Sequence, residues 1–255
     1  MDNFIISLTS VPSRLNSIID KTITELKKQS FKCKIILNIP YTYKKWGDYN
    51  FNKDIFENTD GIIINMCSKD YGPASKLLGA IEYLKNTNNN QIEYIITVDD
   101  DIIFNNLNYL QNLVDNIVNY KDCAITYGGI KLEKSPYRCG NGLKYHIIGS
   151  ADIPAGCRGV LYPVKKLYEN NIVFTFMNTL PDGIFNDDDL YFAIILNLLD
   201  IELVSLKEIY NYIPTENNIK SAVVEKTNID RVTNEMNIIQ YAISKNLLPN
   251  KKKNY

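Results

Sequence analysis

The chain has 255 residues, of which 45% are hydrophobic and 22% charged, and its formal net charge is −1 at pH 7. This composition is ordinary for a globular protein. The near-zero charge argues against bulk attraction to nucleic acid or to an anionic membrane surface. The first residues lack the basic start and apolar stretch of a signal peptide, and no apolar run reaches membrane-spanning length.

The five cysteines are an odd number and show no CxxC spacing. This pattern indicates neither a zinc site nor a disulfide framework. Cys33, Cys67 and Cys123 lie in or beside strand-like runs, where free cysteines act as small buried hydrophobic residues. We therefore expect a protein of the reducing cytoplasm.

Strand and helix patterns alternate through the first half of the chain. Short β-branched runs predict strands at residues 4–8, 34–39, 61–66, 95–98 and 124–127. Apolar residues at helical spacing predict helices that begin near Pro12, Pro73 and Leu107. Such βαβ alternation predicts an α/β fold with a mostly parallel sheet and helices on both faces.

The second half is less regular. Residues 131–154 read as a long glycine-containing loop that holds the only histidine, His146, which is most simply a surface residue. A short strand entering a turn at residues 157–163, a helix opening at residues 187–189, a strand at 202–206 and a last helix at about 229–244 follow. Because no linker separates them, we expect one domain over residues 1–213, with a helical extension, residues 214–255, packed on it.

Three consecutive aspartates, Asp99, Asp100 and Asp101, follow the predicted strand at residues 95–98. Like charges this close raise one another's pKa, which makes the cluster costly. A hard divalent cation would remove that cost, since Mg²⁺ and Mn²⁺ prefer carboxylate oxygen. The alternative is a polar strand end that only turns the chain, but three acids favour metal or phosphate chemistry.

Two further polar clusters follow predicted strands. Thr9 and Ser10 precede Arg14, which can clamp a phosphate, although the segment also reads as a simple helix cap. Asp70 precedes a tight turn, and Lys76 follows it about one helical turn into the predicted helix. Asp70 would hold a ligand hydroxyl and Lys76 a phosphate, or Asp70 would only cap the helix and Lys76 would lie on its surface. Ligands bind at the carboxyl ends of the strands in open sheets, so we expect these clusters and the three aspartates to converge at one edge.

A second acidic cluster, Asp187 to Asp189, opens a predicted helix. Acids at a helix N-terminus are stabilised by the helix dipole and need no further role. Beside a metal and phosphate site, one of these carboxylates can also serve as a general base toward a hydroxyl.

Together these motifs resemble the GT-A glycosyltransferases, the nucleotide-diphospho-sugar transferase superfamily, and especially family-2-like members from bacteria and large viruses. Five segments carry the resemblance, in family order: residues 6–14 (ISLTSVPSR), 69–77 (KDYGPASKL), 98–102 (VDDDI), 159–163 (GVLYP) and 188–191 (DDLY). The resemblance implies a GT-A (Rossmann-like) sheet with a C-terminal helical tail. It also implies a metal-dependent hexosyltransferase that moves a sugar from a nucleotide-diphosphate sugar to an acceptor hydroxyl, with inversion.

The resemblance also implies a role for each matching residue. Donor binding falls to Thr9, Ser10, Arg14, Asp70, Lys76, Asp99 and Asp100. Asp101, with Asp99, would coordinate Mn²⁺ or Mg²⁺ bridging the diphosphate. Gly159 and Tyr162 would border the acceptor, and Asp188 or Asp189 would be the base.

The implied partners are a nucleotide-diphosphate sugar and a glycan, protein or small-molecule acceptor, with no nucleic acid. The cytoplasm would be that of a host if the protein is viral. Many GT-A enzymes add a late histidine as a metal ligand, but no histidine follows His146 here. This absence favours one alternative, a non-catalytic nucleotide-sugar-binding protein. The other alternative is a nucleotidyltransferase acting on a sugar phosphate, which would use the same metal and carboxylates.

Overall fold

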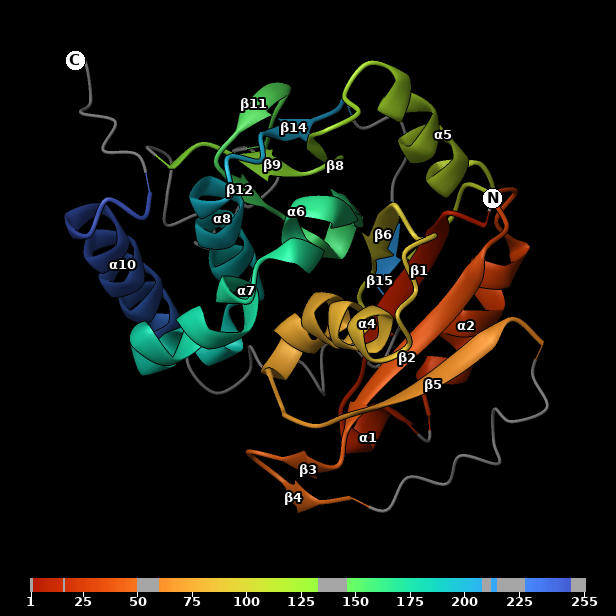
Figure 1. Ribbon diagram of the computed structural model, residues 1–255, viewed down its shortest axis with the longest axis horizontal. Coiled ribbons are helices and arrows are strands. Elements are labelled where there is room, and N and C mark those ends of the chain that lie inside the picture. Colours follow the sequence, from red (N-terminus) through yellow and green to blue (C-terminus); the bar gives the residue numbers. More distant parts are fainter. Residues whose placement is uncertain are drawn as a thin grey trace.

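A sheet of eight strands forms the centre of the computed structural model, which describes residues 2–15, 17–49, 60–132, 146–207, 212–214 and 228–248 (Figure 1). In spatial order the strands are β11 (Gly149–Ala151), β14 (Leu203–Ser205), β8 (Ala124–Thr126), β13 (Val160–Pro163), β6 (Tyr94–Thr97), β1 (Phe4–Thr9), β2 (Lys34–Pro40) and β5 (Ile62–Cys67). Neighbouring strands pair in parallel except at β13 and at β11. The predicted α/β fold with a mostly parallel sheet is confirmed.

Helices cover both faces of this sheet. Successive side chains of a strand point to opposite faces, so the apolar strands present hydrophobic side chains on both faces, and helices bury them. Ile5 and Ile95 pack in one core with α4 (Ser75–Asn86), α6 (Val164–Glu169) and α8 (Asp188–Leu198). Ile6 and Ile96 pack in the other core with α1 (Pro12–Leu15), α2 (Ile19–Lys28) and α5 (Tyr109–Asp115). Figure 1 shows α4 in front of the sheet and α2 behind it.

Smaller elements complete the described part of the chain. Three small sheets are formed by β3 (Thr42–Tyr43) with β4 (Gly47–Asp48), by β7 (Ile102–Phe104) with β15 (Tyr212–Pro214), and by β9 (Gly129–Ile130) with β10 (His146–Ile147) and β12 (Ile153–Pro154). The remaining helices and turns are α7 (Ile172–Thr175), α10 (Asn228–Ser244), η1 (Gly72–Ala74), η2 (Asn116–Val118), η5 (Gly156–Arg158), η6 (Phe176–Thr179) and η7 (Asp182–Asn186). None of the described helices is both long and apolar enough to cross a bilayer.

The helix α10 near the C-terminus packs on the same body as the sheet. Ile238 and Ala242 are buried in the core that α8 shares, and the Tyr241 hydroxyl donates to the carbonyl of Thr179, at 3.1 Å. This helix also supports η7, because Gly183 of η7 lies against Asn234. The extension therefore contacts the segment that leads into the second acidic cluster.

Two of the predictions for secondary structure were wrong in detail. The helix expected from Pro12 is divided into α1 and α2. The expected loop at residues 131–154 contains β10, β11 and β12, strands of only two or three residues that are too short to produce an alternating pattern. Residues 133–145 of that loop lie outside the described residues.

A buried polar network fixes α4 against the sheet. The Asn38 side chain donates to the Ser7 hydroxyl at 2.8 Å, and Ser7 donates in turn to the carbonyl of Lys76. Gly79 makes this approach possible, since a Cβ there would lie 2.7 Å from the Asn38 amide. The network therefore holds the first turn of α4, which carries Lys76, at the sheet edge.

Candidate functional site

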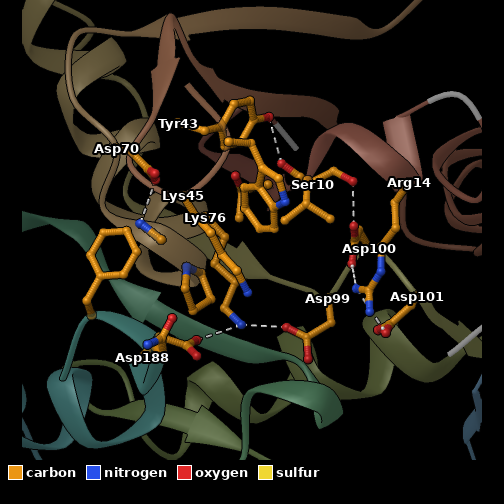
Figure 2. Close-up of a pocket in the computed structure, with 17 residues that line it drawn as sticks. Ser10, Arg14, Tyr43, Lys45, Asp70, Lys76, Asp99, Asp100, Asp101 and Asp188 are labelled. Carbon is orange, nitrogen blue, oxygen red and sulfur yellow. Dashed lines mark hydrogen bonds and ion pairs between the residues drawn. The ribbon is translucent and has the colours of Figure 1, made fainter. Parts of the chain in front are cut away.

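A cleft of about 190 Å³ opens at the carboxyl ends of the parallel strands. All three polar clusters that were expected to converge there do so, together with part of the second acidic cluster (Figure 2). The lining residues are Thr9, Ser10, Val11, Arg14, Tyr43, Lys45, Trp46, Asp70, Gly72, Pro73, Lys76, Asp99, Asp100, Asp101, Phe185, Asn186 and Asp188. The convergence at one edge is confirmed.

Arg14 pairs with two of the three consecutive aspartates. One terminal nitrogen, Nη1, lies 2.6 Å from Asp100 Oδ1 and 3.1 Å from Asp101 Oδ2. The Ser10 hydroxyl donates to the other Asp100 oxygen at 2.5 Å. Burial raises the pKa of Asp100, although Arg14 and Ser10 oppose that rise. Burial and the nearby Asp99 raise the pKa of Asp101 to about 6, so Arg14 does not fully compensate this carboxylate.

Lys76 joins the third aspartate to the second acidic cluster. Its ammonium lies 2.5 Å from Asp99 Oδ1 and 2.7 Å from Asp188 Oδ2, and its side chain is only 5% exposed (Figure 2). Burial alone would lower the pKa of Lys76, but Asp188 and Asp99 raise it well above its usual value. A fixed cation therefore bridges the end of β6 and the start of α8.

These two cations change the argument for a metal that the sequence suggested. Repulsion among Asp99, Asp100 and Asp101 was expected to require a bound cation. In the structure, Arg14 and Lys76 each contact one or two of the three carboxylates. Repulsion alone therefore no longer requires a metal, and the case for one depends on the oxygen ligands present.

The oxygen ligands suit a divalent cation only in part. Among the described residues, no group of three or more His, Cys, Asp or Glu side chains is arranged to hold a metal ion. Asp99 and Asp101 nevertheless line the cleft and offer carboxylate oxygens to it. Mg²⁺ is commonly held by one or two carboxylates plus substrate phosphates and water. The residues therefore fit a cation whose remaining ligands come from a bound phosphate.

Asp70 is fixed by the turn that follows it. Its two carboxylate oxygens accept hydrogen bonds from the backbone N–H groups of Gly72, at 2.7 Å, and Lys44, at 2.8 Å. Gly72 has φ +61°, and a Cβ there would lie 2.4 Å from the carbonyl oxygen of Phe185. Asp70 thus joins the β3–β4 hairpin to the turn before α4, while Gly72 allows the close approach of Phe185. That Asp70 binds a donor stays a prediction.

The three carboxylates of the second acidic cluster make different contacts. Asp187 caps α8 by accepting from the Leu190 N–H. Asp188 lines the cleft and pairs with Lys76. Asp189 accepts from the Gly156 N–H at 2.8 Å and does not line the cleft. Of the two candidate bases, Asp188 alone faces the cleft.

The two residues expected on the acceptor side lie deeper than the cleft wall. Tyr162 is 0% exposed, and its ring packs on Phe192 in the core. Gly159 is buried at the start of β13 with φ +70°, and a Cβ there would point toward Phe104 and Thr97. Neither residue lines the cleft, and their place beside an acceptor stays a prediction.

Sequence reasoning missed the wall formed by the β3–β4 hairpin. Tyr43, Lys45 and Trp46 line the cleft from this hairpin, and the Tyr43 hydroxyl donates to the carbonyl of Ser10 at 2.9 Å. Phe185 lines it from η7. The only available signal was that Trp46 is the single tryptophan of the chain.

No family model matches the sequence, and no curated protein matches it significantly. Solved structures do match. S. aureus TarS residues 1–349 aligns with a TM-score of 0.52 at 13% identity, covering 86% of this chain and 61% of TarS 1–349. A second TarS structure aligns with a TM-score of 0.50 at 14% identity over 86% of this chain and 37% of its own.

The mannosyltransferase PcManGT from Pyrobaculum calidifontis, in complex with GDP-Man and Mn²⁺, aligns with a TM-score of 0.52 at 12% identity. The alignment covers 81% of this chain and 55% of PcManGT. The chain thus spans less than two thirds of the length of each of these three structures. At these identities the likeness shows the fold alone, a GT-A-like α/β fold of the kind that TarS and PcManGT have.

Proposed function

We propose that this protein is a glycosyltransferase that moves a sugar from a nucleotide-diphosphate sugar to an acceptor hydroxyl. The observation that carries the proposal is the cleft itself. On a GT-A fold, it combines two cations, Arg14 and Lys76, with carboxylates from β6 and α8 at the carboxyl ends of parallel strands. Binding of GDP-Man and Mn²⁺ by a protein of the same fold supports this choice of donor and metal.

The donor diphosphate would lie between Arg14 and Lys76. Arg14 offers a planar guanidinium suited to two phosphate oxygens, and Lys76 offers a compact positive charge. Asp99 and Asp101 would hold a divalent cation whose remaining ligands are the phosphates and water. When bound, that cation would neutralise charge on the leaving nucleoside diphosphate. Thr9, Ser10, Asp70 and Asp100 would complete the donor site.

The acceptor hydroxyl would be activated by Asp188. A general base must lie within hydrogen-bond reach of the proton that it takes, and Asp188 faces the cleft whereas Asp189 is held by Gly156. The hydroxyl oxygen would form the new bond to the anomeric carbon as the bond to the diphosphate breaks. The proton would pass to Asp188, and attack opposite the leaving group would invert the configuration.

A thermal-shift screen of nucleotide sugars with Mn²⁺ tests the donor, since a ligand that binds the folded state raises apparent stability. The matching nucleotide sugar should raise the melting temperature, and the shift should shrink when EDTA is added. Full retention of the shift in EDTA would contradict the metal requirement. No shift with any nucleotide sugar would contradict the donor site.

Product analysis and matched variants test the reaction. Free nucleoside diphosphate should be the product, whereas release of pyrophosphate would indicate nucleotidyl transfer instead. Asp188→Asn should lower turnover by about 100-fold or more, as loss of a general base does. Asp182→Asn, an exposed acid of η7, is the matched control and should keep full turnover. Wild-type turnover in Asp188→Asn would contradict the assignment of the base.

A further inference from the structure

The mouth of the cleft carries a cluster of exposed lysines that differs from the cations inside it. We define the lysine rim as Lys44 and Lys45 of the β3–β4 hairpin together with Lys69. Arg14 and Lys76, inside the cleft, pair with carboxylates. The three rim lysines are exposed, and none has an ion pair with a described carboxylate.

The rim is continuous with the cleft. The Lys44 N–H donates to Asp70, the residue next to Lys69, which fastens the hairpin to that segment. The Lys44 ammonium lies 4.6 Å from the centre of the Phe185 ring, and Phe185 lines the cleft. Lys45 lines the cleft directly. A chain-like ligand that leaves the cleft here would therefore run past all three lysines.

Each rim lysine lies over an aromatic ring. Lys45 lies 5.2 Å from the centre of the Trp46 ring, and Lys69 lies 5.3 Å from that of Tyr71. Trp46 is itself 48% exposed and offers a flat apolar surface beside a positive charge. Aromatic faces of this kind pack on other flat faces, and the charges beside them attract anions.

The acids near the rim are already engaged. Asp70 accepts two backbone hydrogen bonds, from Gly72 and Lys44, and Asp48 accepts from the Thr42 hydroxyl. The Lys69 ammonium also donates to Asn178 Oδ1, at 3.3 Å, which is a neutral partner. These acids keep their charge, but neither forms an ion pair with a rim lysine, so none of the three ammonium groups is held by a described carboxylate.

We propose that the lysine rim, with Trp46, binds an acceptor glycan that bears carboxylate or phosphate groups. That the ligand is a glycan rests on the proposed function, and that the glycan is negatively charged rests on the lysine rim. Anionic groups on the glycan pair with the lysines, and a sugar ring packs on Trp46. The reacting hydroxyl then points into the cleft toward Asp188.

Trp46, as the single tryptophan, makes the test direct, because its fluorescence reports binding at this place. The probes are a polygalacturonate oligomer, a phosphomannan oligomer, a neutral maltooligosaccharide and single-stranded oligothymidylate of matched length. The expected result is a saturable change with an anionic glycan that weakens as salt is added, since salt screens exposed charges. No saturable change with either anionic glycan, or tighter binding of the neutral sugar or of oligothymidylate, would overturn the proposal.

The variant Lys44→Gln/Lys69→Gln removes two rim charges that do not line the cleft. It should weaken anionic glycan binding about tenfold, which corresponds to about 1.4 kcal/mol. The matched control is Lys121→Gln/Lys165→Gln, two exposed lysines at the opposite end of β6 and β13. Equal weakening in the control would contradict a specific rim.

The nucleotide-sugar thermal shift is measured in parallel with the same proteins. A thermal shift with a nucleotide sugar but no glycan binding would contradict the role proposed for the lysine rim and leave the proposed function intact. Glycan binding without a thermal shift for any nucleotide sugar would support anion binding at the lysine rim and contradict the proposed function.

Discussion

Replacing Lys76 by methionine tests the central electrostatic feature of the cleft. Methionine keeps an unbranched side chain of similar length, so the buried stem can still pack. The substitution removes the ammonium that lies 2.5 Å from Asp99 and 2.7 Å from Asp188. Two carboxylates at the end of β6 and the start of α8 would then face each other without the cation between them.

The expected cost follows from the burial of these carboxylates. Removing one partner of a buried ion pair typically costs about 3–5 kcal/mol, because the remaining charge has no compensation. The side chain of Asp188 is 11% exposed, whereas that of Asp99 is 29% exposed and keeps contact with water. We therefore expect a loss near the lower end, about 3 kcal/mol. For a chain of this size, that loss lowers the melting temperature by about 6–12 °C.

Thermal and urea denaturation measure this loss. The matched control is Lys85→Met on the same helix, whose ammonium contacts Asn171 and two aromatic rings and has no carboxylate partner among the described residues. The control should stay within about 1 kcal/mol of the wild type. Adding Asp188→Asn to Lys76→Met should recover part of the loss, since one orphaned charge is then neutral. Equal stability of Lys76→Met and Lys85→Met, or further loss in the double variant, would refute the reasoning.

Three further predictions concern the body that supports the cleft. Replacing glycine by alanine inside a helix ordinarily stabilises it by about 0.5–1 kcal/mol. Gly79→Ala should instead lower the free energy of unfolding in urea by about 1–3 kcal/mol, because the new methyl would lie 2.7 Å from the Asn38 side chain. A more stable variant would contradict the close packing. Burial raises the pKa of Cys67 to about 12, so native protein at pH 8 should resist iodoacetamide at this thiol until it is unfolded. Rapid alkylation of Cys67 in the native state, read by peptide mass spectrometry, would contradict its burial. Tyr241→Phe removes the hydrogen bond to Thr179 and should cost about 0.5–1.5 kcal/mol in thermal melts; an unchanged melting temperature would show that this bond contributes nothing to the docking of α10.

The sequence could predict the fold and the edge at which the polar clusters meet. Parallel strands share the direction of their carboxyl ends, so residues that follow β1, β5 and β6 must lie near one another. The partners of the cations could not be predicted. Arg14 and Asp100 are 86 residues apart, and Lys76 and Asp99 are 23 residues apart. Their pairing depends on side-chain directions that only the packed structure determines.

The β3–β4 hairpin was missed for a different reason. Each of its strands has two residues, which is too short for an alternating pattern to be recognised. The burial of Tyr162 could not be predicted from the sequence motif either. In the strand Val160–Pro163, the first three residues are all buried whichever face they point to, so residue order alone did not tell which face meets a ligand.

The position of β13 has a consequence for the order in which the protein assembles. This strand, Val160–Pro163, lies between β6, Tyr94–Thr97, and β8, Ala124–Thr126, and pairs with both. During synthesis, β6 and β8 emerge from the ribosome well before β13. Until then β6 has one unpaired edge and β8 has two, because its other neighbour, β14 (Leu203–Ser205), emerges later still. Such long-range pairing is slow, and exposed edges favour aggregation. We therefore expect the nascent chain to depend on chaperones until β14 has emerged, at about residue 205, with the cleft among the last features to form.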